Sequence, residues 1–129
     1  MVDMHPLQAY KFLRSEADAV LVDVRSELEY FFVGHAEGAL HIPWHVESGT
    51  EVNLNFIESL LKFVGSRERP VVLICRNGDR SKEAALHAEK HQFTRIYNVL
   101  YGFEGNMDHI NRRNQLNGWR YDGLPWEQC

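Results

Sequence analysis

Short apolar runs alternate with segments of helical pattern along most of this chain, and this alternation limits its possible folds more than any other feature. Three runs rich in aliphatic and β-branched residues have the length of buried strands: 19–24, 71–74 and 95–100. Apolar residues in 57–64 repeat at i, i+3, i+4 and i+7, as on one face of a helix. Strands that alternate with helices pair in parallel through right-handed crossovers. We therefore predict an α/β fold with a central parallel β-sheet and helices on both faces.

Other elements follow from local signals at helix ends and turns. They are a helix after Pro6, a short helix between Ser26 and Gly34, a strand over 38–43 and a helix over 81–93. From Gly102 onward the chain is polar and turn-rich, yet it contains Trp119 and Trp126. Disordered tails rarely hold two tryptophans, so we expect this segment to pack back on the domain.

The overall composition is that of a soluble globular protein, and 129 residues are best interpreted as one domain, 1–129. The net charge of -4 and the scattered Lys and Arg argue against nucleic acid as a partner. The sequence has no apolar stretch of membrane-spanning length and no signal-peptide pattern, so we expect no membrane partner and a cytoplasmic location. Two cysteines, Cys75 and Cys129, do not suggest a disulfide framework or a zinc site.

One segment concentrates the chemistry, and it reads Cys75-Arg76-Asn77-Gly78-Asp79-Arg80-Ser81. It joins a buried strand to a helix N-terminus, where backbone N–H groups stabilise a thiolate and bind anions. The guanidinium groups of Arg76 and Arg80 suit the oxygens of an anionic substrate. Asn77 and Gly78 permit the positive φ angles that such a loop needs. Asp79 would repel an anion unless it points outward or pairs with an arginine. This pattern predicts a cysteine nucleophile that attacks an anionic, sulfur-containing substrate.

Several motifs, in the right order from about 20 to 128, resemble the rhodanese-like family. They are Val20-Leu21-Val22-Asp23-Val24-Arg25; Glu29-Tyr30 followed by Gly34-His35-Ala36-Glu37-Gly38-Ala39-Leu40-His41-Ile42-Pro43; the segment Cys75 to Ser81; Asn98-Val99-Leu100-Tyr101-Gly102-Phe103; and Gly118-Trp119-Arg120 with Gly123-Leu124-Pro125-Trp126. The cysteine loop is similar to the active loop of single-domain sulfurtransferases of the thiosulfate type.

The resemblance implies a covalent persulfide on Cys75, formed from a donor such as thiosulfate and passed to a thiol or to cyanide, with a thiol-bearing protein as a further possible acceptor. Backbone N–H groups from Arg76 to Ser81 would hold the persulfide, and no cofactor is implied. Asp23, with Arg25 as its partner, would have a structural role. In two-domain thiosulfate enzymes an arginine near the position of Glu29 helps to hold the donor. Glu29 stands in its place here, so this contact to the donor is absent.

Other hypotheses use the same residues. Phosphatases that use Cys-x5-Arg surround a phosphate, whereas Arg80 stands at Cys-x4-Arg, which disfavours a phosphate ester. A sulfur carrier or interaction module would use the same cysteine. Cys129 is a candidate for relaying sulfur or for a disulfide with Cys75, although a terminal cysteine is more often incidental. His87 and His91 have the i, i+4 spacing of metal ligands, but a third ligand is not evident, so we predict no metal site.

Overall fold

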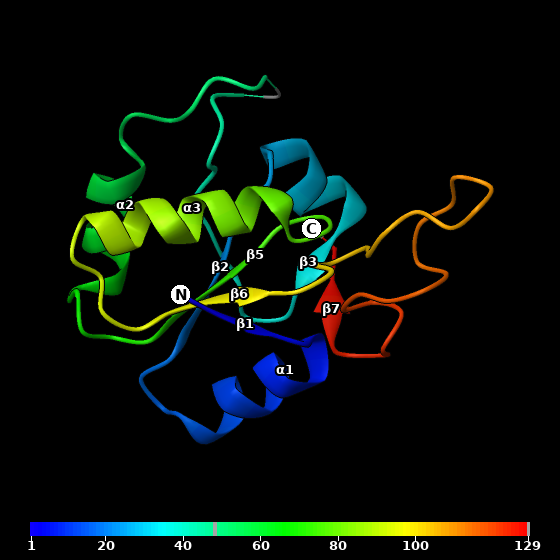
Figure 1. Cartoon of the computed structure of the whole chain (residues 1–129), viewed down its shortest axis with the longest axis horizontal. Helices are drawn as coiled ribbons and strands as arrows, with labels where there is room; N and C mark the ends of the chain where they lie inside the picture. Colours follow the sequence, from blue (N-terminus) through cyan, green and yellow to red (C-terminus); the bar gives the residue numbers. More distant parts are fainter. Residues whose placement is uncertain (48, 129) are drawn as a thin grey trace.

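The computed structural model describes residues 1–47 and 49–128. Its central sheet has five strands, all paired in parallel, in the order β1-β6-β5-β2-β4. They are β1 (Val2–Met4), β2 (Val20–Asp23), β4 (Leu40–His41), β5 (Val71–Ile74) and β6 (Ile96–Val99). Figure 1 shows these strands at the centre of the molecule. The predicted parallel α/β fold is confirmed.

Helices cover both faces of this sheet (Figure 1). They are α1 (Pro6–Ser15) on one face, with α2 (Phe56–Val64) and α3 (Asp79–Lys90) on the other. Successive side chains of a strand point to opposite faces, so β5 contributes side chains to the core on both faces of the sheet. Val71 and Leu73 pack in the cluster that contains α2 and α3, and Val72 and Ile74 pack in the cluster that contains α1. Because both faces of β5 are buried, its sequence is a continuous apolar run.

The C-terminal segment packs on the domain, as predicted. Trp119 is buried and belongs to the core cluster on the α1 side of the sheet. Farther along, β7 (Trp126–Glu127) pairs antiparallel with β3 (His35–Ala36). This pairing fixes the chain next to η1 (Glu29–Val33), a short π-helical turn where the sequence predicted a short helix.

Two boundaries differ from the prediction, and three strands of the described chain, β1, β3 and β7, were missed. The expected strand over 38–43 has only two residues in β4, and α3 begins at Asp79 because Gly78 adopts a left-handed conformation just before it. Strand β1 has three residues, one of them Asp3, so its apolar pattern is too short to recognise. Its hydrogen bonds come from β6, far away in the sequence. None of the helices in the described part of the chain is long and apolar enough to cross a membrane.

Candidate active site

Cys75 lies at the carboxyl end of the sheet, directly after β5 and four residues before α3 begins at Asp79. Its side chain is fully buried. Two donors point at the sulfur: the backbone N–H of Gly78, with an N–Sγ distance of 3.1 Å, and the hydroxyl of Ser81, with an Oγ–Sγ distance of 3.2 Å. Both donors lower the free energy of a thiolate more than that of a thiol. The buried sulfur therefore has hydrogen-bond donors available on two sides.

Gly78 makes this arrangement possible. Its φ angle is +103°, which turns its N–H group back toward the sulfur and starts α3 at the next residue. A Cβ at this position would lie 3.3 Å from the backbone N of Tyr101 and 3.4 Å from the carbonyl oxygen of Val99. Both the positive φ angle and the short contacts to this Cβ position favour glycine at residue 78. The start of α3, whose first N–H groups have no carbonyl partner within the helix, comes to lie close to Cys75 in the chain.

Behind the sulfur, a chain of polar side chains runs to the far edge of the sheet. The Ser81 hydroxyl lies 2.5 Å from Oδ1 of Asn98 on β6. Asn98 in turn donates from Nδ2 to Oδ1 of Asp3 on β1, over 3.0 Å. Ser81 and Asn98 are buried, so these bonds satisfy polar groups that would otherwise be costly to bury. The position of the Ser81 hydroxyl is therefore set from both sides.

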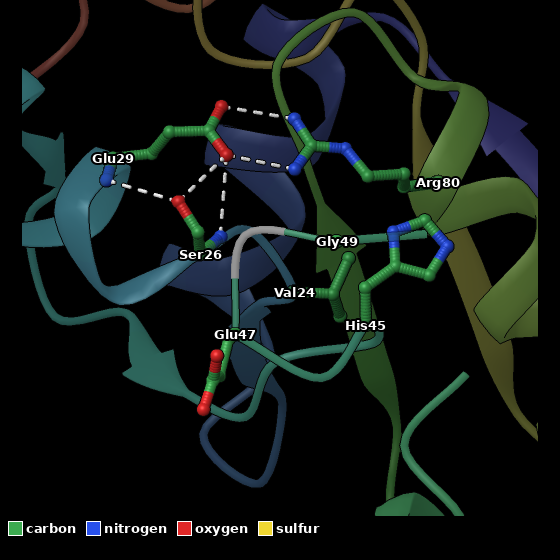
Figure 2. Close-up of a pocket in the computed structure, with 7 residues that line it drawn as sticks. All are labelled: Val24, Ser26, Glu29, His45, Glu47, Gly49 and Arg80. Atoms are coloured by element: carbon green, nitrogen blue, oxygen red, sulfur yellow. Dashed lines mark hydrogen bonds and ion pairs between the residues drawn. The ribbon is translucent and has the colours of Figure 1, made fainter. Parts of the chain in front are cut away.

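In front of the loop, Arg80 forms a bidentate ion pair with Glu29 (Figure 2). The Nη1–Oε1 distance is 2.7 Å and the Nη2–Oε2 distance is 2.9 Å. Ser26 holds the same carboxylate through its backbone N–H and its hydroxyl, both donating to Oε1. The carboxylate thus accepts four hydrogen bonds. Arg80, which the sequence predicted to bind an anionic donor, already has an internal anion as its partner.

The pair shifts the ionisation of both groups. Burial raises the pKa of Glu29, but the hydrogen bond and charge of Arg80 and the bonds from Ser26 outweigh it and lower the pKa to about 2. The hydrogen bond to Glu29 raises the pKa of Arg80 most; burial opposes this, and the negative charges of Glu29 and Cys75 add to it. Both members of the pair are therefore charged at any physiological pH.

A cavity of about 120 Å³ lies beside this ion pair, as Figure 2 shows. It is lined by Val24, Ser26, Glu29, His45, Glu47, Gly49 and Arg80. Val24 belongs to the same apolar cluster as Cys75, and Arg80 belongs to the cysteine loop, but Cys75 is not itself among the lining residues. Its size suits a small molecule of a few heavy atoms. Its lining carries fixed charges of both signs.

The side chains of Arg76, Asn77 and Asp79 are not among the hydrogen-bond donors to the sulfur. Arg76 is exposed and forms no ion pair within the described residues. Asp79 is also exposed. Its carboxylate accepts a hydrogen bond from Nδ2 of Asn77 over 3.1 Å, and its backbone N–H donates to Oδ1 of Asn77. Asp79 therefore points outward, one of the two arrangements that the sequence left open, and its bonds with Asn77 close the loop locally.

The predicted pairing of Asp23 with Arg25 is present and fully buried. Arg25 donates from Nε and Nη2 to the carboxylate of Asp23, and Nη2 also donates to the carbonyl of Gly34 over 2.6 Å. Its guanidinium lies 4.6 Å from the ring centre of Phe103. Phe103 donates its backbone N–H to the carbonyl of Cys75, over 2.8 Å. The pair thus contacts the residue that binds the Cys75 carbonyl, and neither Asp23 nor Arg25 lines the cavity.

Gly102 allows the segment after β6 to approach the cysteine loop. A Cβ at Gly102 would lie 2.3 Å from the carbonyl oxygen of Cys75 and 2.7 Å from the carbonyl carbon of Arg76. No side chain fits in that space. The close approach lets Phe103 and Glu104 donate their N–H groups to the carbonyls of Cys75 and Arg76.

Two further sequence features were weighed as functional, the histidine pair of α3 and the second cysteine. The rings of His87 and His91 lie 4.5 Å apart between centroids on α3, and among residues 1–47 and 49–128 no three His, Cys, Asp or Glu groups converge as metal ligands. Cys129, considered as a sulfur relay, lies outside the described residues.

The sequence correctly placed Cys75 in a loop between a strand and a helix start, but it did not indicate three residues that contribute to the surroundings of this loop. Nothing local shows that Glu29 pairs with Arg80, because 51 residues separate them. Asn98 has a recognisable signal, a buried polar residue inside the strand Ile96–Val99. Gly102 belongs to a recognised motif, but its closeness to Cys75 depends on the folded chain.

Comparisons with known proteins agree with this geometry. The crystal structure of Rv0390 from M. tuberculosis superposes with a TM-score of 0.88 at 39% identity, covering 100% of this chain and 98% of that one. The polysulfide-sulfur transferase homodimer from Wolinella succinogenes gives a TM-score of 0.67 at 26% identity, covering 100% and 80%. The thiosulfate sulfurtransferase GlpE of Glaesserella parasuis is 31% identical over 105 residues, which are 80% of this chain and 83% of the relative.

The model of the family described as "Rhodanese-like domain" matches residues 6–108, which include β2, the whole cysteine loop and the Gly102 segment. This match covers most of the chain and confirms the resemblance found in the motifs. The chain belongs to the rhodanese-like domain family.

Proposed function

We propose that this protein is a sulfurtransferase that carries sulfane sulfur as a persulfide on Cys75. Membership of the rhodanese-like family supports sulfur transfer in general. The names of two relatives, a thiosulfate sulfurtransferase and a polysulfide-sulfur transferase, support it further. The donor in this proposal is a small sulfane-sulfur species such as thiosulfate, and the acceptor is cyanide or a thiol.

The observation that carries the proposal is the pair of donors aimed at a buried sulfur. Gly78 N–H and Ser81 Oγ–H both lie within 3.2 Å of Cys75 Sγ. A buried structural cysteine behaves as a small apolar side chain and has no need of such donors. A thiolate or a persulfide anion does need them, because negative charge buried without partners is costly.

The reaction then has two displacement steps. The Cys75 thiolate attacks the outer sulfur of thiosulfate, the new Sγ–S bond forms, the S–S bond of the donor breaks, and sulfite leaves with the electron pair. In the second step an acceptor thiolate or cyanide attacks the outer sulfur of the persulfide. The Sγ–S bond breaks and its electron pair returns to Cys75 as the thiolate. This is a ping-pong cycle with one covalent intermediate.

Intact mass spectrometry after incubation with thiosulfate tests the proposal. We expect the mass of one added sulfur atom, with peptide mapping placing it on Cys75 and not on Cys129. Cyanide should then remove the sulfur as thiocyanate. Cys75→Ser should keep the fold, checked by circular dichroism, and lose both signals. Thiocyanate formation by Cys75→Ser, or phosphate-ester hydrolysis without a persulfide, would refute the assignment.

Exposed apolar side chains near Glu29 in the sequence support a thiol-bearing protein as a further acceptor. Leu28 and Phe32 flank Glu29 in the sequence, and 59% and 69% of their surfaces are exposed. A contiguous exposed apolar patch is typical of a protein contact site. If the protein is mainly a sulfur carrier, Cys75 should load once with thiosulfate and turn over slowly until a protein acceptor is added. Fast turnover with cyanide or small thiols alone would favour the enzyme.

A further inference from the structure

The ion pair between Glu29 and Arg80 has a consequence for the choice of sulfur donor. Arg80 is the arginine of the cysteine loop that lines the cavity, and its guanidinium fork is fully matched by one carboxylate. A planar guanidinium that binds a carboxylate in bidentate fashion presents the same edge that would bind a sulfonate. An anionic donor must therefore compete with Glu29 for Arg80.

Glu29 is a strong competitor because it is held in place. Ser26 donates two hydrogen bonds to Oε1, and the backbone N–H of Glu29 donates back to the Ser26 hydroxyl. This reciprocal arrangement fixes the carboxylate at the start of η1. The side chains of Glu29 and Arg80 are 20% and 24% exposed, so solvent screens their interaction only in part.

The charges around the cavity do not favour a dianion. Glu29 and Arg80 cancel each other, and Glu47 adds a second carboxylate to the lining. In Figure 2 the Glu47 side chain points away from the ion pair, so Glu29 remains the carboxylate that neutralises Arg80. Thiosulfate carries two negative charges and approaches a thiolate that carries a third. Exposed Arg76 is on the loop but is not among the residues that line this cavity.

We infer that Glu29 determines donor specificity by occupying Arg80. The cavity then favours an alkyl hydropersulfide, which carries at most one negative charge, over dianionic thiosulfate. This inference rests on the proposed role of Cys75 and narrows its donor class. In the transfer, the Cys75 thiolate attacks the terminal sulfur of R–S–SH and a new Sγ–S bond forms. The S–S bond of the donor breaks, R–S⁻ leaves with the electron pair, and the proton stays on the transferred sulfur.

The test compares two donors on the wild type and on Glu29→Gln. Loading of Cys75 is followed by mass spectrometry in single turnovers, and kcat/KM is measured with cyanide as acceptor. We expect Glu29→Gln to raise kcat/KM for thiosulfate about tenfold, mostly through KM, because it releases one guanidinium charge to the donor. The value for an alkyl hydropersulfide should change by less than about threefold. Glu27→Gln, the same substitution at an exposed carboxylate two residues away and outside the cavity lining, is the matched control.

A double-mutant cycle with Arg80→Gln separates specificity from structure. If Glu29 acts through Arg80, the gain with thiosulfate disappears when Arg80→Gln is also present. Denaturant unfolding of each variant shows whether it is folded, and the cycle can be repeated with Glu29→Ser if Glu29→Gln is not. An equal effect on both donors, or a gain that survives Arg80→Gln, overturns the inference. If neither donor places sulfur on Cys75 of the wild type, the proposed function itself fails.

Discussion

The Ser81 hydroxyl has one proton and three acceptors within hydrogen-bond distance. They are Asn98 Oδ1 at 2.5 Å, Cys75 Sγ at 3.2 Å and the carbonyl oxygen of Gly78 at 3.3 Å. Only one of them can receive the proton at a time. A thiolate is a stronger acceptor than a thiol, so ionisation of Cys75 draws the proton toward the sulfur. Ser81 can therefore respond to the charge on the nucleophile during the reaction.

Replacing Ser81 by alanine should slow the loading of Cys75 about tenfold at pH 7. The change removes a hydrogen bond to a charged group, worth roughly 1.5–3 kcal/mol, and leaves Gly78 N–H as the donor seen at Sγ. The rate is measured by quenching the reaction with thiosulfate and mapping the added sulfur to Cys75. Ser81→Thr keeps a hydroxyl and should recover most of the rate. Loading of Ser81→Ala at the wild-type rate would show that the hydroxyl serves only the fold.

For single residues, the sequence predicts the place of Cys75 in the fold better than it predicts the partners of the surrounding side chains. Cys75 is recognisable because a strand, a Gly-containing loop and a helix start are all local patterns. The partners of Ser81 and Arg80, Asn98 and Glu29, lie 17 and 51 residues away. Side-chain partners at such separations depend on the order of strands in the sheet, which local periodicity does not determine.

Among the elements, the segment after β6 acts as the support for the cysteine loop. Its N–H groups at Phe103 and Glu104 bind the carbonyls of Cys75 and Arg76, at 2.8 and 2.9 Å. These bonds need the close approach at Gly102, where a Cβ would overlap the carbonyl oxygen of Cys75. The shape of the loop is thus imposed by a neighbouring element as well as by its own residues.

Gly102→Ala should therefore impair both folding and loading. The alanine adopts a positive φ at a cost of about 1 kcal/mol, and the overlap with Cys75 raises the total to roughly 3 kcal/mol or more. Gly65→Ala is the matched control, because Gly65 also has a positive φ but a Cβ there would meet no atom within 4 Å. Urea unfolding gives the stability, and mass spectrometry gives the loading rate. Equal effects of the two substitutions would contradict the supporting role.

The accuracy of the sequence prediction varied with the type of element. The runs that became β2 and β5 were predicted because strands buried on both faces are continuously apolar. Strand β1 was not, because it has three residues and includes Asp3. Its place is set by pairing with β6, with Val2 opposite Tyr97 and Met4 opposite Val99. Short edge strands of this kind depend on their partners more than on their own pattern.

For the whole molecule, the ion pair of Glu29 and Arg80 links η1 to α3, and this link makes stability depend on pH. The pKa of Glu29 is lowered to about 2 in the folded state, from an ordinary value of 4.5. A carboxylate with a lowered folded-state pKa adds stability that is fully present above its unfolded pKa. That contribution is lost as the pH falls from about 4.5 toward 2. The expected loss is at most about 3 kcal/mol, with partial solvent screening reducing it.

Urea unfolding of the wild type and of Glu29→Gln from pH 7 to pH 2.5 measures this link. At pH 7 the wild type should be the more stable of the two, because glutamine keeps the geometry but not the charge that pairs with Arg80. As the pH falls below about 4.5, Glu29 becomes protonated in the unfolded state first, and the two stability curves should converge. The curve of Glu27→Gln should stay parallel to that of the wild type, since Glu27 is exposed and has no ion pair among the described residues. If the curves of wild type and Glu29→Gln stay parallel down to pH 2.5, the ion pair does not stabilise the folded protein. A donor could then bind Arg80 without competing against Glu29.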